Sequence, residues 1–575
     1  MLTTHRWALL GLAAVPLVFS ALMVRSPSLV WWTTHALEKI RPEDAIPESP
    51  AGEARIFAAR NEFEPFQVVV RGDRERIRRV DLEASDLEGP GGAVIGKRHI
   101  ALYYEWFLNL QKPSSVEGGA GEWPDPLIPR VDRYYGQRRN AFPFDLSPNR
   151  NQPIWVEVYV PREAQPGDYA GSITVTVEGR RQADIPVRLT VWDFTLPSTS
   201  SLPTTFGFSG ISAIRQHKGG YTSDADVYAL SHIYRKSALW HRVSIHGGSM
   251  APPTVHRRHG KLRLDWTSFD AEVGPFLDGT VFSRTEPLHG ARATSIDLRE
   301  NRTLRSDAEK IQYYREFIRH FRNKGWADRL FNYLFDEPKP SDSAEVLRRG
   351  RLVRAADSQI KNLLTASFNP AWAEVVDIWA PLVNCLEPRP GFHDFCDPVV
   401  ERDAYSAEIA GGKKLWWYQS CASHGCATAG GEYFRGWPSY MIDQSAVANR
   451  VMPWLAWKYE IGGELYFNLT EAWASKDNPW QSVDRFSGNG DGTLFYPGRP
   501  DGVGGTTHIP IESIRLKLIR EGLEDYEYIV MLSKKTAPSR AAQAVNAVVR
   551  KLYDFERDPG KFYAARRAMG EELGK

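Results

Sequence analysis

One repeating pattern in the middle of the chain constrains its fold more than any other feature. A helix-like segment leads through a glycine or a loop into a short apolar strand, and the strand ends at a polar residue. Such alternation is typical of a parallel β/α barrel, in which the strand ends converge on one mouth. We therefore expect a (β/α)8 TIM-like barrel over residues 201–535. Its expected strands are residues 204–208, 242–245, 330–335, 362–367, 375–379, 414–418 and 464–467.

The clearest unit of this pattern ends in two adjacent carboxylic acids. Apolar residues recur at three- and four-residue steps over residues 306–324, which predicts an amphipathic helix. The strand 330–335 follows, and Asp336 and Glu337 come directly after it. Because the chemistry of a barrel enzyme lies at the carboxyl ends of its strands, we expect this pair to be catalytic. The alternative is that Asp336 only caps a helix beginning at Pro338.

The chain before and after the barrel has a different character. Over residues 29–200, alternating and β-branched runs are separated by proline and glycine turns, which predicts an antiparallel β-sandwich. Within it, residues 111–149 lack any period and are expected to form a long surface excursion. Residues 536–575 are expected to form a charged helical extension. The sequence thus predicts a multidomain protein.

The amino-terminal segment has the pattern of an export signal. Residues 7–24 are almost wholly apolar and lie between Arg6 and Arg25. This pattern predicts a signal peptide over residues 1–28, or a membrane anchor if the segment is not cleaved. No later segment approaches membrane-spanning length, so we expect a secreted or periplasmic protein, membrane-anchored only if the leader is retained.

The four cysteines cluster in one part of the predicted barrel, at Cys385, Cys396, Cys421 and Cys426. In an oxidising compartment they suit two short-range disulfides. A structural zinc is a second interpretation, although the spacings do not match a zinc ribbon. Free buried thiols are the third.

Charge and aromatic content favour a glycan over a nucleic acid as the partner. Lys and Arg total 72 and Asp and Glu total 70, so the chain lacks the basic excess of nucleic-acid-binding proteins. The 19 Trp, 23 Tyr and 26 Phe residues suit a site that stacks against sugar rings. We expect a glycan substrate, no cofactor, no metal, and no membrane partner beyond the leader. The sequence does not indicate an oligomeric state.

Five segments in the second half of the chain carry a family resemblance. They are YLFDEP (333–338), LWWYQS (415–420), MPWLAWKYEIGGELYFNLTEAW (452–473), GDGTLFYPG (490–498) and SIRLKLIREGLEDYEYIVML (513–532). Together, and in this order, they resemble the catalytic domain of glycoside hydrolase family 123 over residues 200–535. An amino-terminal sandwich is also what this family leads one to expect.

The resemblance implies β-N-acetylgalactosaminidase activity by substrate-assisted catalysis, in which the 2-acetamido oxygen of the sugar attacks its own anomeric carbon. Asp336 would orient the amide nitrogen and stabilise its positive charge. Glu337 would protonate the leaving oxygen and later activate water. The residues themselves agree with unequal roles, because consecutive side chains at a strand end point in different directions. The two acids are thus not expected to flank a glycosidic bond as facing carboxylates.

Other residues at the strand ends are candidate substrate-binding groups. Tyr418 can donate to the attacking acetamido oxygen, or can be only a packed aromatic. Asn468 and His246 can bind sugar hydroxyls, although a lone histidine at a strand end is as often structural.

A stacking wall for the sugar is expected from three tryptophans, Trp416, Trp417 and Trp473. Alternation along a strand should nevertheless send at least one of the first two into the barrel wall.

The sequence leaves three functions open. The first is release of terminal β-linked N-acetylgalactosamine or, less readily, N-acetylglucosamine. The second is a glycosidase of the same fold that acts on another sugar by a conventional acid and nucleophile pair. The third is a non-catalytic carbohydrate-binding surface protein, which would have no chemical need to keep Asp336 and Glu337 together.

Overall fold

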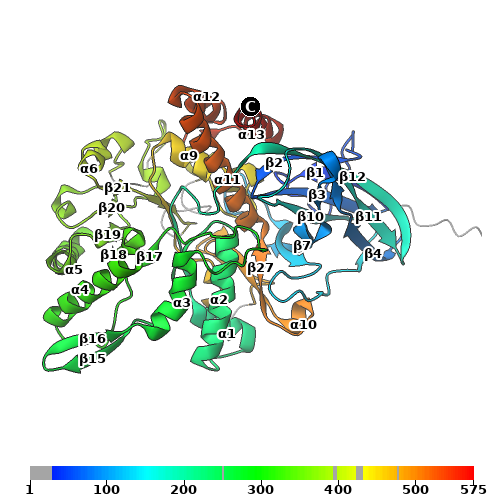
Figure 1. Ribbon diagram of the computed structural model, residues 1–575. Coiled ribbons are helices and arrows are strands. Elements are labelled where there is room, and N and C mark those ends of the chain that lie inside the picture. The colour runs from blue at the N-terminus through cyan, green and yellow to red at the C-terminus, as the bar shows by residue number, and fades with distance from the viewer. Residues whose placement is uncertain (1–28, 249–250, 393–395, 397, 422–430, 475–477) are drawn as a thin grey trace, which may run out of the picture.

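The computed structural model describes residues 29–248, 251–392, 396, 398–421, 431–474 and 478–575. The expected signal peptide, residues 1–28, lies outside these ranges. Within them, no helix combines the length and the apolar character that a membrane span requires. The described chain forms an amino-terminal, mostly β domain and a second domain built on parallel strands, with helices of the carboxyl end lying across both (Figure 1).

The first sheet of the amino-terminal domain is antiparallel. Its strand order is β1-β3-β10-β7-β8-β27-β26. These strands are β1 (Leu29–His35), β3 (Glu62–Gly72), β7 (Ile100–Leu110), β8 (Gly121–Pro129), β10 (Asn151–Val160), β26 (Phe495–Gly498) and β27 (Ile509–Ser513). Strand β10 lies inside this sheet and is buried at every position.

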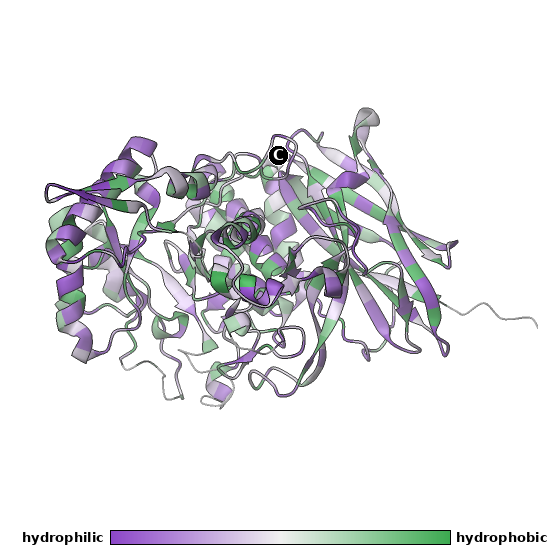
Figure 2. Cartoon of the chain, turned by 90° about the horizontal axis from the view of Figure 1, so that it is seen from below, coloured by the Kyte–Doolittle hydropathy of each residue, from purple (hydrophilic) through white to green (hydrophobic). Residues whose placement is uncertain are grey.

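The second sheet packs against the first and has the order β2-β12-β11-β4-β9. The strands in this order are β2 (Ala54–Arg60), β4 (Ile77–Ala84), β9 (Phe144–Leu146), β11 (Gly167–Val177) and β12 (Arg180–Thr195), and the short strands β5 (Leu87–Glu88) and β6 (Val94–Ile95) join the sheet through β11. Hydrophobic and hydrophilic residues alternate along the strands of this domain (Figure 2), and Ile185 and Val187 of β12 join Val68 and Val156 of the first sheet in one core. The domain is not wholly antiparallel as expected, because β12 and β2 pair in parallel.

The second domain contains two arcs of parallel strands. Their orders are β14-β13-β23-β22 and β17-β18-β19-β20-β21. The strands are β13 (Thr204–Phe208), β14 (Ile245–Gly247), β17 (Ile296–Asp297), β18 (Leu330–Phe335), β19 (Lys361–Leu364), β20 (Ile378–Trp379), β21 (Lys414–Leu415), β22 (Trp417–Gln419) and β23 (Glu464–Tyr466). At one junction β14 and β17 are neighbours, and at the other β22 follows β21 after a single residue.

Helices precede most of these strands and cover their outer side (Figure 1). They are α1 (Gly210–Lys218), α2 (Asp224–Trp240), α3 (Thr267–Asp278), α4 (Asp307–Lys324), α5 (Ser343–Ala356), α6 (Ser406–Ala410), α8 (Ala446–Arg450) and α9 (Met452–Lys458). Helix α4 shows how the sequence sets their limits. The Ser306 hydroxyl caps its start by accepting from the Glu309 N–H, and Gly325 ends it with a φ of 71°.

The structure departs from the expected elements in four places. The expected strand 242–245 is instead Ile245–Gly247, and β17 has no counterpart among the expected strands. The expected surface excursion 111–149 contains β8 and β9, and β8 lies inside the first sheet. Strands β26 and β27 come from the range expected to be barrel, yet they complete the sheet of the amino-terminal domain.

The carboxyl-terminal helices join the two domains. Helix α11 (Ile514–Lys535) is buried along most of its length and contacts β3 and β8 of the first sheet as well as α8 and α9. Helix α12 (Pro538–Val548) packs against α11, and α13 (Pro559–Leu573) reaches β2 and β12. The segment expected as an extension therefore packs on the amino-terminal domain.

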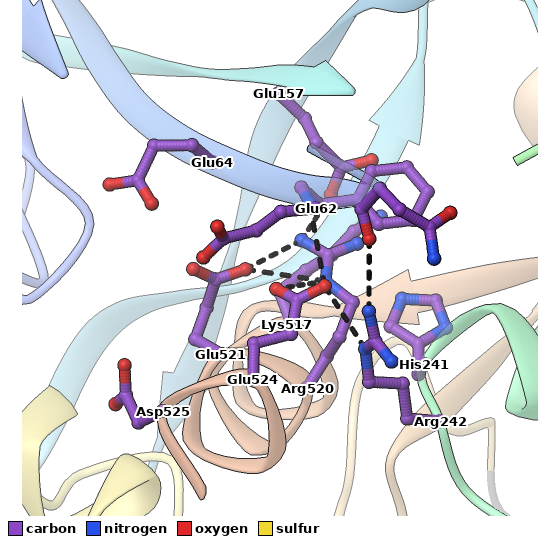
Figure 3. A network of polar contacts seen from close by, with 12 residues as sticks. Glu62, Glu64, Glu157, His241, Arg242, Lys517, Arg520, Glu521, Glu524 and Asp525 are labelled. Atoms are coloured by element: carbon purple, nitrogen blue, oxygen red, sulfur yellow. Dashed lines mark hydrogen bonds and ion pairs between the residues drawn. The ribbon is translucent and has the colours of Figure 1, made fainter. Parts of the chain in front are cut away.

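A buried network of charged groups lies where α11 meets β10 (Figure 3). Glu157 of β10 accepts from Arg520 at 2.7 Å and lies 3.0 Å from the Lys517 ammonium. Arg242, which precedes β14, donates to Glu524 of α11 at 3.1 Å. Since each of these groups is buried, each depends on its partners for compensation of the lost hydration.

Candidate active site

Strand β18 carries a bulge immediately before the two acids. Tyr333 pairs with Leu363 of β19, but Phe335 pairs with the next residue, Leu364, so Leu334 is extra. Leu334 and Phe335 both pack into the main core outside the parallel strands, and Arg349 of α5 lies 5.0 Å above the Phe335 ring. Tyr333 packs instead against the cluster inside the arcs. The bulge thereby places two consecutive side chains on the same side of the strand, just before its polar end.

Asp336 is held by two hydroxyl groups. The Tyr333 hydroxyl donates to Asp336 Oδ1 at 2.8 Å, and Thr365 Oγ1 donates to the same oxygen at 3.1 Å. Thr365 Oγ1 also accepts from the Glu337 N–H at 2.9 Å. Thr365 is 2% exposed and follows β19, so one buried hydroxyl fixes both acids.

Glu337 is held by a different partner and in an unusual backbone conformation. The Tyr418 hydroxyl of β22 donates to Glu337 Oε1 at 2.5 Å. The φ of Glu337 is 44°, in the left-handed region that side chains other than glycine rarely adopt. Such strain persists only where the surroundings impose it, and it clusters at functional sites. Asp336 and Glu337, called the acid pair below, are both exposed.

A cavity of about 560 Å³ opens beside Glu337. Its volume lies in the range of small-ligand sites. The wall comes from the residues after β19, from Tyr418, and from a segment that includes a disulfide. The lining residues are Glu337, Pro338, Thr365, Ala366, Ser367, Phe368, Asn369, Pro370, Trp372, Leu382, Cys385, Cys396, Pro398, Val400 and Tyr418.

The disulfide in this wall joins Cys385 and Cys396, whose Cα atoms are 5.4 Å apart. The expectation of a short-range disulfide is thus confirmed at this pair. Cys421 is also disulfide-bonded, whereas Cys426 lies outside the described residues. In the part of the chain that the structure describes, no group of three or more His, Cys, Asp or Glu residues is arranged to hold a metal.

His246 lies near the acid pair, at the end of β14. Its ring stacks on Tyr333 with centroids 5.9 Å apart, and its Nδ1 is 3.1 Å from Thr205 Oγ1. Burial lowers the pKa of His246, although the nearby Asp297 carboxylate opposes this. Asp297 in turn accepts from the Gly247 N–H at 3.1 Å.

The three tryptophans and Asn468 do not line this cavity. Trp416 is 3% exposed in the cluster inside the arcs, while Trp417 is fully buried in the core outside them, as alternation requires. Trp473 is 1% exposed and packs edge-on against Tyr234. The Asn468 amide donates to Glu471 at 2.7 Å and its oxygen accepts from a local backbone N–H.

Three contributors to the site were missed in the sequence. Thr365 lies inside the expected strand 362–367, but the observed strand β19 ends one residue before it. Asp297 belongs to β17, a strand of two residues that is too short to show a period in the sequence. Tyr333 was noted only as part of the YLFDEP segment, although its spacing of three residues from Asp336 could have indicated their contact.

Comparisons with known proteins point to one family of glycoside hydrolases. The model "Glycoside hydrolase 123, catalytic domain" matches residues 306–532, and the model "Glycoside hydrolase 123 N-terminal domain" matches residues 33–177. No curated protein matches the chain significantly.

Among solved structures, a family 123 glycoside hydrolase from Clostridium perfringens, studied for glycolipid glycan hydrolysis, superposes with a TM-score of 0.65. The two are 14% identical, and the match covers 95% of this chain and 97% of that one. A family 39 glycoside hydrolase from Bacteroides cellulosilyticus is far less similar, with a TM-score of 0.30, 9% identity, and coverage of 74% and 77%.

Proposed function

The chain belongs to glycoside hydrolase family 123, and on that premise we propose that it releases terminal β-linked N-acetylgalactosamine with the substrate's own acetamido group as nucleophile. This type of catalysis is an exception to the usual pair of facing carboxylates. Asp336 and Glu337 are adjacent in sequence and differ in their surroundings, which supports two different roles.

The observation that carries the proposal is the asymmetry between the two acids. Asp336 Oδ1 accepts from two hydroxyl groups, which hold this carboxyl in one position. Glu337 accepts from Tyr418 and lies on the wall of the cavity. An anion held in place suits stabilisation of the amide, and an acid beside the cavity suits proton transfer to the leaving group.

The proposed reaction has two steps. In the first, Glu337 donates its proton to the glycosidic oxygen as the C1–O bond breaks, and the acetamido oxygen bonds to C1. Asp336 holds the amide N–H and offsets the positive charge that develops on it. In the second, Glu337 takes a proton from water, the water oxygen bonds to C1, and the bond to the acetamido oxygen breaks. The configuration at C1 is retained after two inversions.

We further propose that the two parallel arcs form one closed TIM-like barrel. The neighbouring positions of β14 and β17 support closure on one side, and the continuity of β21 with β22 supports it on the other. A parallel bridge between Leu382 and Tyr418 also links the arcs. In such a barrel the acid pair would stand at the carboxyl-end mouth.

We also propose that the protein is exported. The Cys385–Cys396 disulfide supports an oxidising compartment, and the apolar amino-terminal segment of the sequence supports export. Glycans of glycolipids, the substrates named for the Clostridium perfringens enzyme, are therefore a class to test.

Nitrophenyl glycosides test the sugar and an intermediate analogue tests the mechanism. We expect hydrolysis of the β-N-acetylgalactosaminide and inhibition by a thiazoline analogue of the cyclic intermediate. Glu337→Gln should lower kcat by about 10²–10⁴-fold on substrates with a poor leaving group, and less on those with an activated one. Failure of the thiazoline to inhibit an active enzyme would exclude substrate assistance and favour a conventional nucleophile.

A further inference from the structure

A second cavity, of about 470 Å³, lies at the amino-terminal ends of the parallel strands. Its lining includes the first residues of several strands, Leu330 of β18, Lys361 of β19, Ile378 of β20 and Lys414 of β21. The acid pair, by contrast, follows the last residue of β18, and Glu337 lines the cavity described above. Because parallel strands run from one end of the domain to the other, the two cavities are separate sites.

The wall of this second cavity is strongly basic. Arg292, Arg329, Lys361 and Lys414 line it, and Asp328 is the one carboxylate among its lining residues. Among the described residues, neither the Arg292 guanidinium nor the Lys414 ammonium has a carboxylate within ion-pair distance. Their charges are therefore available to a ligand.

The other two cations are only partly compensated. Arg329 Nε is 3.9 Å from Asp328, and the Lys361 ammonium is 3.7 Å from Asp377, which also accepts from Arg354. Burial lowers the pKa of Arg329, and the nearby charge of Arg292 lowers it further against the opposing effect of Asp328. Gathering like charges in this way has a cost that a bound anion would remove.

Trp416 adds a neutral donor to the same wall. Its indole Nε1 is buried and has no hydrogen-bond partner within the described residues. An unpaired buried donor costs free energy unless a ligand or water accepts from it. Guanidinium, ammonium and indole N–H groups together match the oxygens of a tetrahedral oxyanion.

We propose that this second cavity binds a sulfate or phosphate group, either as the free anion or as an ester carried on a glycan. It does so independently of hydrolysis at the acid pair. Oxyanions should therefore bind whether or not the proposed glycosidase activity is correct.

Calorimetric titration of the full chain with inorganic sulfate and with inorganic phosphate tests this proposal. Chloride balances the ionic strength in every titration, because screening alone changes the apparent affinity of surface cations. The double variant Arg292→Glu, Lys414→Glu reverses two exposed charges and should bind either anion at least about tenfold more weakly. Lys261→Glu, a single charge reversal at an exposed residue of the hairpin formed by β15 (Thr254–Arg258) and β16 (Lys261–Asp265), should bind like the parent.

The source of the oxyanion is tested with a sulfated N-acetylhexosamine and its unsulfated form, titrated into a Glu337→Gln background. Tighter binding of the ester than of inorganic sulfate supports a glycan-borne group, and equal binding supports the free anion. Unchanged affinity for both inorganic anions in the double variant, or equal weakening by Lys261→Glu, would overturn the proposal. The unsulfated sugar reports binding at the acid pair alone. Because the readout is binding, none of these outcomes depends on turnover.

Discussion

At the scale of single residues, one hydroxyl connects the two acids. Thr365 Oγ1 donates to Asp336 Oδ1 and accepts from the Glu337 N–H. We predict that Thr365→Val lowers kcat/KM by about 10–100-fold, because both acids lose their fixed positions. It should also cost about 0.5–1.5 kcal/mol of unfolding free energy, since the hydrogen bonds of the Thr365 hydroxyl are lost.

Thr365→Ser is the matched control, because it keeps the hydroxyl and removes only a methyl group. It should retain activity within a small factor in the same kinetic assay. Equal activity of the valine and threonine forms would show that the hydroxyl does not position the acid pair.

The Tyr418 hydroxyl is the partner of Glu337 Oε1. Tyr418→Phe should therefore lower kcat by about 10–100-fold with little change in stability, because the ring still fills its place inside the arcs. Steady-state kinetics measure the effect. Tyr228→Phe is a matched control, because that hydroxyl donates only to the Ala271 carbonyl on the surface. A similar loss of kcat in Tyr228→Phe would show that the effect is not specific to the Tyr418 hydroxyl.

The left-handed backbone of Glu337 predicts that glycine is more stabilising than alanine at this position, the reverse of their order in a helix. With a φ of 44°, any side chain is strained by about 1–2 kcal/mol, and glycine is not. Glu337→Gly should therefore be more stable than Glu337→Ala in denaturant unfolding, although both are inactive. At Arg319, an exposed position within α4, alanine should be the more stable by about 1 kcal/mol. The usual order at both positions would show that Glu337 is not strained.

At the scale of elements, the sequence predicted β13 and β18 with their observed limits. It did not predict the bulge at Leu334, since an extra residue in a strand leaves no trace in an apolar run. Nor did it predict β17, whose two residues show no period, and Asp297 was missed with it. The acids and Tyr418 could be found in the sequence, but the contacts of Thr365 and Asp297 could not.

The tryptophans show a related limit of sequence analysis. Aromatic residues at strand ends suit both a sugar platform and a core, and composition does not distinguish these uses. Strand alternation assigned Trp416 and Trp417 to opposite faces, but burial of both faces was not visible in the sequence.

The Cys385–Cys396 disulfide closes a short loop in the wall of the cavity beside Glu337. We predict that replacing both cysteines with alanine costs about 2–3 kcal/mol of stability, through greater freedom of the unfolded chain. We also expect KM to rise more than kcat falls, because the wall contributes to binding rather than to proton transfer. Thermal unfolding and steady-state kinetics measure the two effects, and an unchanged KM would exclude a role of this wall in binding.

At the scale of the whole molecule, the domains are not independent units. Strands β26 and β27 and helix α13 return from the second half of the chain to the amino-terminal domain. Sequence-based boundaries at 200 and 535 could not show this return, because local patterns carry no information about which distant segments pair. Because α11 is enclosed by both domains, the charged side chains along it are buried and form the network of Figure 3.

This buried network predicts how stability depends on pH. Burial raises the pKa of Glu521 and of Glu524 to about 7 against 4.5 in the unfolded chain, although Arg520 opposes the shift of the first and Arg242 that of the second. The folded state then binds more protons than the unfolded state between about pH 4.5 and 7. The contribution of each carboxyl is complete below pH 4.5 and is lost as the pH rises to 7. Glu512 acts in the opposite sense, because Lys517 and His241 overcome burial and lower its pKa to about 2, so its contribution is lost as the pH falls below 4.5.

Glu521→Gln removes one of these titrations and should make stability less dependent on pH. Relative to the parent, the variant should gain about 1–3 kcal/mol of unfolding free energy between pH 4.5 and 7, because the parent loses that contribution over the same interval. Denaturant unfolding at several pH values measures the difference. Glu571→Gln, at an exposed position of α13, should follow the parent at every pH. A constant difference between Glu521→Gln and the parent would mean that the Glu521 carboxyl does not titrate in this interval, and that its cationic neighbours keep it charged throughout.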